Sequence, residues 1–443
     1  MTLRSLSLCA LAASTLIART GFAQQSGAVT GLTATSSIPA ISPENGLLLS
    51  DGALLHGGVS VEGGYDSNVF YNDKGYETGS PLTRVTPFLD FTNTARNGEV
   101  PSGLFFDMKA ALTYREYLSS DPEVTRLRSF TPTISANVEH NAKGTVAFGF
   151  SDSFARLQDA PYLKSQTSMI VRDTNLASAQ LRLAPGGGRI QGVIRLSNMI
   201  DWFEKDTQLT AANSMTNEVM LDASWRWLPK TALYFQVRQG YVLYFDPNAM
   251  GASALVSSGG KKSSFPLRAV VGVRGLVTEK TSIALALGYQ NAFYSGGANT
   301  SSDGFLGNMT MAGELTYLPI FQARLVLGAK HEFQNSVIGN FYYSDGGYAS
   351  LTYQAPMRLI GQLWGSYEYR RYHGLPTAAD GDGTRTDNFL QGGTSLDYHV
   401  NSWFFVGLSY SLTHNQSDAP AVEFVSGATY TKHQVFARLG VTY

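Results

Sequence analysis

Through most of the chain, apolar and polar side chains alternate along segments of roughly ten to sixteen residues. In TALYFQVRQGYVLYF (231–245), Leu233 and Phe235 fall on one face of an extended chain, and Gln236 and Arg238 fall on the other. A period of two over this length predicts β-strands, because helices place apolar residues three or four positions apart. The chain is therefore expected to be all-β.

The connections between these segments fall into two classes that alternate along the chain. Tight turns such as NAKG (141–144) and APM (355–357) alternate with longer polar connections such as 246–263 and 373–385. Transmembrane β-barrels have this pattern, with short periplasmic turns and longer outer loops. The sequence therefore predicts a transmembrane antiparallel β-barrel of about eighteen strands, with both termini on the periplasmic side.

The N-terminal residues do not follow this alternation. Residues 1–23 are predicted to be a secretory signal peptide, in which Arg4 precedes a short apolar run and GFA forms a small-x-small cleavage site. Residues 24–54 are rich in Ser, Thr, Ala, Gly and Pro and are predicted to be a flexible periplasmic leader, so that residues 55–443 form the barrel. The single cysteine, Cys9, lies in the signal peptide, and the mature chain is expected to have no disulfide or thiol nucleophile.

The composition narrows the class of protein further. Charged residues make up 15% of the chain, well below the roughly 25% that is usual for soluble domains. The formal net charge is −1, which gives no reason to expect a nucleic acid as a partner. Together with the signal peptide, these properties predict a protein surrounded by lipid in the outer membrane of a Gram-negative bacterium.

The C-terminal segment KHQVFARLGVTY (432–443) supports this prediction. Val435, Leu439, Val441 and the terminal Tyr443 fall on one face, and the chain ends on an aromatic residue. Bacterial outer-membrane barrels typically end in this way, and the barrel assembly machinery recognises the terminal strand. The alternative is the edge strand of a soluble β protein.

The polar face of the predicted strands is rich in arginine. If the apolar face contacts lipid, alternation places these cations in the lumen: Arg84, Lys109, Arg115, Arg189, Arg195, Arg226, Arg238, Arg268, Arg274, Arg324, Lys330, Arg358, Arg370 and Arg438. The acids assigned to the same face are fewer: Asp90, Asp107, Glu139, Glu218, Asp222, Glu314, Glu332, Glu368 and Asp397. Arginine suits bidentate contacts, and basic rings favour anions in pores, so the sequence predicts a path for an anionic or polar solute. The alternative is that Arg–acid pairs brace the wall.

Four aromatic residues also fall on the predicted inward face: Phe105, Tyr234, Tyr244 and Trp364. Tyr234 and Trp364 are candidates for a sugar-conducting surface, because sugars stack their C–H faces on aromatic rings. The alternative is that these rings belong to the aromatic belts and that the assumed register is shifted.

The sequence gives little sign of catalytic or metal chemistry. His331 and Glu332 resemble the start of an HExxH zinc site, but position 335 is Asn335 and the segment is a predicted strand. In the predicted outer loop ADGDGTRTDN (379–388), Asp380, Asp382 and Asp387 could bind Ca²⁺, but the loop lacks the terminal Glu of an EF-hand, and an ordinary solvated loop is the better explanation. No catalytic residue, metal ligand or cofactor is therefore predicted, and the protein is not expected to be an enzyme.

The stretch GGYDSNVFYN (63–72) resembles the first strand of the β-barrel porin 2 family, which carries an Asp-x-Asn-Val-Phe/Tyr motif after the signal peptide. The matching residues here are Asp66, Asn68, Val69 and Phe70. Members often accompany genes for exopolysaccharide biosynthesis and export. The resemblance therefore implies a conduit for a secreted polysaccharide, with periplasmic export proteins as partners, and it transfers no catalytic residue.

Two other functions remain open at this stage. The barrel could be a general or substrate-selective uptake porin, which the Arg-rich lumen also suits. It could instead be an outer-membrane barrel enzyme or a surface adhesion protein, whose catalytic cluster would be assembled only in space.

Overall fold

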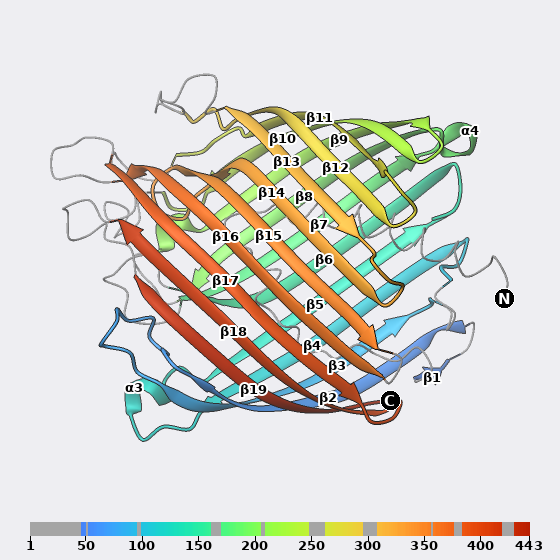
Figure 1. Ribbon diagram of the computed structural model, residues 1–443. Helices are drawn as coiled ribbons and strands as arrows, with labels where there is room; N and C mark the ends of the chain where they lie inside the picture. The colour runs from blue at the N-terminus through green and yellow to red at the C-terminus, as the bar shows by residue number, and fades with distance from the viewer. Residues whose placement is uncertain are drawn as a thin grey trace.

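In the computed structural model, the residues described are 46–49, 52–94, 99–160, 170–204, 209–247, 262–295, 308–355, 358–375, 383–418 and 429–443. Within these ranges the chain forms a closed antiparallel β-barrel of eighteen strands, β2 to β19, as the sequence pattern predicts (Figure 1). The predicted signal peptide and most of the predicted leader lie outside the described residues.

The strands follow one another around the ring in chain order, and each pairs with its sequence neighbours. Their bounds are β1 Leu47–Leu48, β2 Leu54–Asp66, β3 Ser80–Thr92, β4 Leu104–Tyr117, β5 Ser129–His140, β6 Val146–Asp159, β7 Ile170–Leu183, β8 Ile190–Glu204, β9 Ser214–Leu228, β10 Thr231–Tyr244, β11 Leu267–Leu276, β12 Thr281–Asn291, β13 Met309–Tyr317, β14 Ala323–Asn335, β15 Phe341–Ala355, β16 Leu359–Leu375, β17 Gly383–His399, β18 Phe404–Asp418 and β19 Tyr430–Thr442. In the described parts of the connections there are three short helical turns: α3 Pro122–Thr125, α4 Pro185–Gly188 and η2 Thr210–Ala212. No helix in the described part of the chain is long and apolar enough to cross a membrane.

The ring closes where the last strand pairs with the first long one. β19 runs antiparallel to β2, and Gly57 and Tyr443 exchange two backbone hydrogen bonds of 3.0 and 2.8 Å at the end of this seam. The short strand β1 pairs with β2 beside that point, with Leu47 opposite Leu55. The end of the segment predicted as a flexible leader is thus attached to the barrel.

The two ends of the barrel differ in the length of their connections. The turns between β5 and β6, β9 and β10, and β11 and β12 lie at one end, together with the C-terminus, and we call this the short-turn end (Figure 1). The connections at the other end, the loop end, are mostly longer. Two connections depart from the predicted alternation, because residues 93–103 form a long connection at the short-turn end and residues 336–340 a short one at the loop end.

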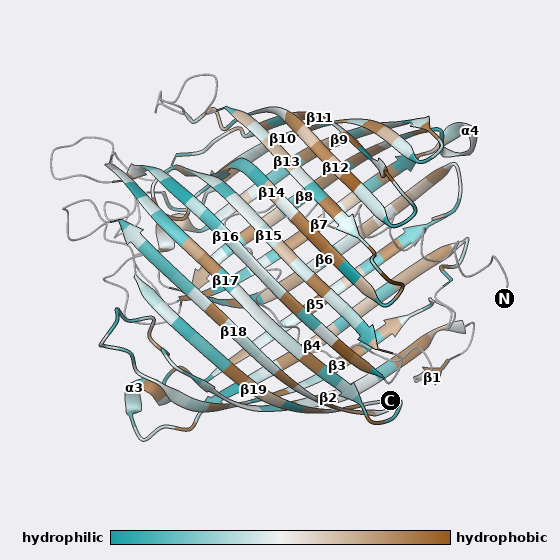
Figure 2. Cartoon of the chain, in the orientation of Figure 1, coloured by the Kyte–Doolittle hydropathy of each residue, from teal (hydrophilic) through white to brown (hydrophobic). Residues whose placement is uncertain are grey.

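The outer surface of the barrel is apolar and its inner surface is polar. Along β2, Val59, Val61 and Tyr65 are exposed on the outside, whereas Ser60 and Glu62 are buried on the inside. Figure 2 shows the resulting alternation of hydrophobic and hydrophilic positions along the strands. Lipid cannot satisfy backbone hydrogen bonds, and only a closed ring of strands pairs all of them while presenting apolar side chains outward. A closed β-barrel with this distribution of side chains is the architecture that suits lipid outside and water inside.

Inward-facing glycines accommodate aromatic rings from the neighbouring strand. Six such pairs stand directly opposite each other in the ladder: Gly58 and Phe88, Gly64 and Phe436, Gly272 and Tyr234, Gly328 and Tyr348, Gly393 and Trp364, and Gly440 and Phe405. A Cβ atom at any of these glycines would crowd the ring opposite. The rings therefore lie against the backbone of the wall, where cross-strand contact stabilises the sheet.

This packing makes Gly440 sensitive to substitution. In Gly440→Ala the new methyl group would overlap the Phe405 ring, and we expect the free energy of unfolding to fall by about 1–3 kcal/mol. The measurement is the temperature at which the purified barrel loses its compact migration on a gel run in dodecyl sulfate. Gly63→Ala is the control, because a Cβ at Gly63 meets nothing within 4 Å. Equal melting temperatures for the two variants would contradict this account.

Candidate functional site

The ladder register fixes which predicted lumen residues point inward. Those on the inner face are Arg84, Lys109, Arg115, Arg195, Arg226, Tyr234, Arg238, Arg268, Arg274, Arg324, Lys330, Trp364, Arg370 and Arg438. Arg189 and Arg358 lie outside the strands, in the connections before β8 and β16. Arg358 has a positive φ of 61°, and its carbonyl oxygen accepts a hydrogen bond from the His399 amide. Alternation does not continue through a turn, so the strand register does not place Arg358 in the lumen.

The inner face also carries charged residues that sequence alternation did not identify. The additional cations are Arg172, Arg182, Arg385 and Lys432, and the additional acids are Glu62, Asp66, Asp159, Asp201 and Asp387. Strands β7 and β17 carry polar residues on both faces, so neither face is apolar enough to reveal the register. With these acids included, the predicted excess of bases in the lumen is much smaller.

Most of the inward cations form ion pairs with inward-facing carboxylates, which lie on the same strand or on a strand one or two positions away in the ring. Arg84 Nε lies 2.7 Å from Glu62, and Lys330 Nζ lies 2.7 Å from Glu332 and 3.3 Å from Glu368. Arg370 also pairs with Glu368, and the pairs Arg385–Asp387 and Arg438–Asp397 repeat the pattern. These cations have their charge neutralised by the wall itself. They therefore brace the barrel, as the alternative interpretation of the sequence proposed.

Three arginines near the short-turn end differ from this pattern. Arg226 on β9, Arg274 on β11 and Arg324 on β14 lie close to the ends of their strands, and Arg226 and Arg274 both stand opposite Ala232 on β10. Among the described residues, no carboxylate oxygen lies within 4.0 Å of their guanidinium nitrogens. We call these three residues the basic arc. Their charge is available to a solute, because the wall does not neutralise it.

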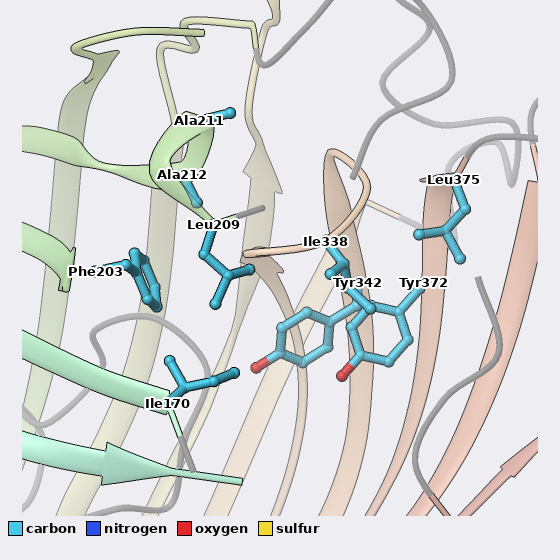
Figure 3. Close-up of a cluster of buried hydrophobic side chains, with 9 residues drawn as sticks. All are labelled: Ile170, Phe203, Leu209, Ala211, Ala212, Ile338, Tyr342, Tyr372 and Leu375. Carbon is cyan, nitrogen blue, oxygen red and sulfur yellow. The ribbon is translucent and has the colours of Figure 1, made fainter. Parts of the chain in front are cut away.

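At the loop end, an apolar cluster joins two separate parts of the wall. It comprises Ile170, Phe203, Leu209, Ala211, Ala212, Ile338, Tyr342, Tyr372 and Leu375, and we call it the apolar bridge. Figure 3 shows the side chains from β7, β8 and the β8–β9 connection facing those from the β14–β15 connection, β15 and β16. Strands β9 to β14 lie between these two groups in the ring. The bridge therefore crosses the lumen like a chord, held together by apolar burial.

Local hydrogen bonds hold both connections in place for this contact. Asn213, after η2, accepts from the Phe203 amide through its side chain at 2.7 Å and from the Phe245 amide through its carbonyl at 3.0 Å. On the other side, the Asn340 amide donates to the His373 carbonyl at 2.9 Å. Gly339 has a positive φ of 64°, which turns the chain between Ile338 and Asn340.

A cavity of about 180 Å³ lies next to the bridge. Its lining includes four arginines, Arg172, Arg238, Arg268 and Arg370, together with the acids Asp201, Glu218 and Glu332 and several tyrosines. Arg172 lies 3.0 Å from Asp159, and Arg268 lies 3.7 Å from Glu332. Arg238 Nε donates to the Gln236 side chain at 3.0 Å. The cavity thus presents guanidinium groups, carboxylates and phenols in a confined space, which suits a small polar solute.

The inward aromatic rings do not form an open stacking surface. Trp364 is only 6% exposed because its ring lies against Gly393, and Tyr234 lies against Gly272 with the Arg274 guanidinium 5.3 Å from its ring centroid. The prediction that Tyr234 and Trp364 offer free ring faces to sugars therefore does not fit the structure. Sequence alternation could place the rings inside the barrel, but only the ladder reveals the glycine opposite each one.

The motif that resembles the β-barrel porin 2 family forms a latch inside the closing seam. Asp66 Oδ2 lies 2.8 Å from Lys432 Nζ and accepts from Gln434 at 2.9 Å, while its Oδ1 accepts from the Asn68 amide. The Asn68 side chain donates to the carbonyls of Asn72 and Thr431, which ties the connection after β2 to the start of β19.

Hydrophobic packing completes the latch. Val69 is fully buried in a cluster with Leu82, Tyr117, Val124 and Phe436, and Phe70 packs against the edge of that cluster. Burial raises the pKa of Tyr71 in the same connection, and the Asp66 carboxylate adds to this effect. The motif residues thus hold the first long connection within the barrel and show no open ligand site.

The weak metal motifs separate in the structure. His331 faces outward and lies 2.5 Å from Asp345, whereas Glu332 faces inward and pairs with Lys330. Asp387 faces inward beside Arg385, while Asp380 and Asp382 lie outside the described residues. The described part of the chain contains no group of three or more His, Cys, Asp or Glu side chains that could hold a metal ion.

Comparison with known proteins finds only distant similarity. No protein-family model matches the sequence, and no curated protein matches it either. Solved structures with a similar fold include the outer membrane protein OpdK from Pseudomonas aeruginosa, at 10% identity and a TM-score of 0.44, over 88% of this chain and 99% of that chain. They also include two receptors from P. aeruginosa. A mutant of the ferric enterobactin receptor PfeA has 8% sequence identity and a TM-score of 0.43, and the siderophore receptor PirA has 9% identity and a TM-score of 0.42. Each match covers 88% of this chain and 80% of the receptor chain. These similarities are weak, and no functional property is transferred from them.

Disrupting the apolar bridge should widen the passage. The double variant Leu209→Ser and Ile338→Ser removes about 1.5–3 kcal/mol of apolar burial per residue, so the two connections should separate. We expect a higher single-channel conductance in planar bilayers. Val326→Ser is the control, because Val326 also faces the lumen, on β14, but lies outside the bridge. Unchanged conductance in the double variant would mean that the bridge does not limit the current.

Proposed function

We propose that the protein is a substrate-selective outer-membrane channel that admits small anionic or polar solutes. The observation that carries this proposal is the basic arc of Arg226, Arg274 and Arg324, whose charges have no carboxylate partner within 4.0 Å among the described residues. Fixed positive charge at a constriction or mouth of a water-filled pore raises the local concentration of anions and lowers that of cations.

The contrast with the paired cations strengthens this argument. Arg84, Arg370 and Arg438 are neutralised by their acid partners and contribute little net potential. The planar guanidinium of an unpaired arginine can bind a carboxylate or phosphate in a bidentate manner. The cavity beside the apolar bridge is lined by arginines, and the basic arc lies nearer the short-turn end. A solute that crosses the barrel would therefore meet guanidinium groups near both ends.

The apolar bridge favours a small solute over a polymer, because it divides the loop end of the lumen. The inward rings lie against glycines, which leaves a sugar chain little flat surface to stack on. Export of a polysaccharide rests on the Asp66–Phe70 motif, and here those residues make latch contacts. Uptake is therefore the function that the geometry supports best, with the short-turn end facing the periplasm.

The basic arc can be tested by removing its charge. In the triple variant Arg226→Ser, Arg274→Ser and Arg324→Ser, we expect the ratio of chloride to potassium permeability to fall by about twofold or more, because the unpaired charges are lost. The reversal potential under a potassium chloride gradient gives this ratio. The effect should be larger at low ionic strength, where these charges are less screened.

A charge-neutral double variant provides the matched control. In Arg438→Gln with Asp397→Asn, one cation and its own acid partner are removed together. This variant should keep the selectivity of the unmodified protein. Equal selectivity in the triple variant and the unmodified protein would overturn the role of the basic arc.

A deletion strain separates uptake from export. We expect slower growth on limiting small organic anions and an unchanged amount of released polysaccharide. Loss of polysaccharide outside the cell, or its accumulation in the periplasm, would instead support the export function that the motif implies.

A further inference from the structure

Four polar side chains on the outer face of the barrel form a patch that lipid cannot satisfy. They are Asp152 on β6, Asn175 on β7, Asn198 on β8 and Asn217 on β9, and we call them the outer polar patch. Asn175 Nδ2 donates to Asp152 Oδ1 at 2.9 Å, and Asn198 Nδ2 donates to Asn217 Oδ1 at 2.9 Å. The patch therefore spans four consecutive strands.

The register shows that these residues face outward. Phe148 and Phe150 share the face of Asp152 and are 56% and 52% exposed, while the alternate residue Ala147 is buried. Leu196 is exposed on the same face as Asn198, as is Val219 on the same face as Asn217. The ladders from β5 to β9 show no register shift that would reverse this assignment.

The depth of the patch makes it unusual. Asp152 lies near the middle of β6, and Asn198 lies near the middle of β8. At the middle of β18, on the opposite side of the ring, the outward residues are apolar, as Leu408 and Leu412 illustrate. Ionisable and amide groups within a bilayer normally face protein or water, because hydrocarbon offers them no hydrogen-bond partner.

A charged cluster continues the patch towards the loop end. Arg156 on β6 donates to both carboxylate oxygens of Asp173 at 2.8 Å and lies 2.5 Å from Glu204. This cluster also faces outward, beside the exposed Trp202. The polar surface therefore extends from mid-strand to the loop end along one side of the barrel.

We propose that this outer face of β6 to β9 is the contact surface for a second copy of the same chain in the plane of the membrane. A second barrel of this chain necessarily carries the same groups at the same depth. Asparagine amides both donate and accept hydrogen bonds, so Asn175, Asn198 and Asn217 can pair with their own counterparts across a two-fold axis. The flanking Phe150, Phe154 and Leu196 supply an apolar surround that excludes lipid from the polar centre.

Cysteine cross-linking in intact outer membranes tests this contact. In a Cys9→Ser background, which lacks other cysteines, Asn198→Cys is treated with a short membrane-permeant bismaleimide. We expect a product with the mass of two chains, because residue 198 lies near the proposed axis. Leu412→Cys is the matched control at mid-strand depth on β18, and it should give no such product.

The cross-linking result decides whether a second copy of the chain contacts this face. No product from Asn198→Cys above the Leu412→Cys control would overturn the proposal, and so would a product whose mass is not twice that of the chain. A second variant guards against a chance collision. Asp152→Leu with Asn175→Leu should abolish the Asn198→Cys cross-link while the barrel remains folded, whereas a persistent cross-link would count against the contact.

Discussion

Every backbone N–H and C=O group that lies in the bilayer must find its partner within the protein, and the rest of this structure depends on that constraint. The chain meets it by pairing β19 with β2, which closes the ring at the Gly57–Tyr443 hydrogen bonds. Closure then dictates a period of two, with apolar side chains outward and polar side chains inward. It also allows inward rings such as Phe405 to lie against glycines such as Gly440.

In a water-filled lumen lined with charged side chains, the positive and negative charges must largely neutralise one another. Most inward cations have an acid partner on the same strand or on one nearby in the ring, as Arg84 has Glu62, and such pairs stiffen the wall without producing a strong net field. The few arginines without such partners therefore dominate the potential that a solute experiences. Selectivity, on this view, depends on the cations that the wall leaves unneutralised, and the total number of arginines says little about it.

The burial of apolar side chains away from water also shapes the inside of the barrel. Connections at the loop end carry apolar residues that escape water only by folding inward, as Leu209 and Ile338 do in the apolar bridge and Val69 does in the latch. These contacts narrow the passage and place the Arg-lined cavity beside the bridge. Outside, the outer polar patch reverses the usual rule, which explains why it is best understood as a contact with protein.

The sequence by itself determined the barrel, its eighteen strands and the inward direction of most of the predicted arginines, because alternation is a local property that lipid and water impose on each strand. It could not determine which cations are neutralised, since Arg438 meets Asp397 only through the register of β17 to β19. It also missed Arg172 and Arg385, whose strands are polar on both faces. The apolar bridge was decided by tertiary structure alone, because its two halves lie far apart in the chain and meet only when the ring closes.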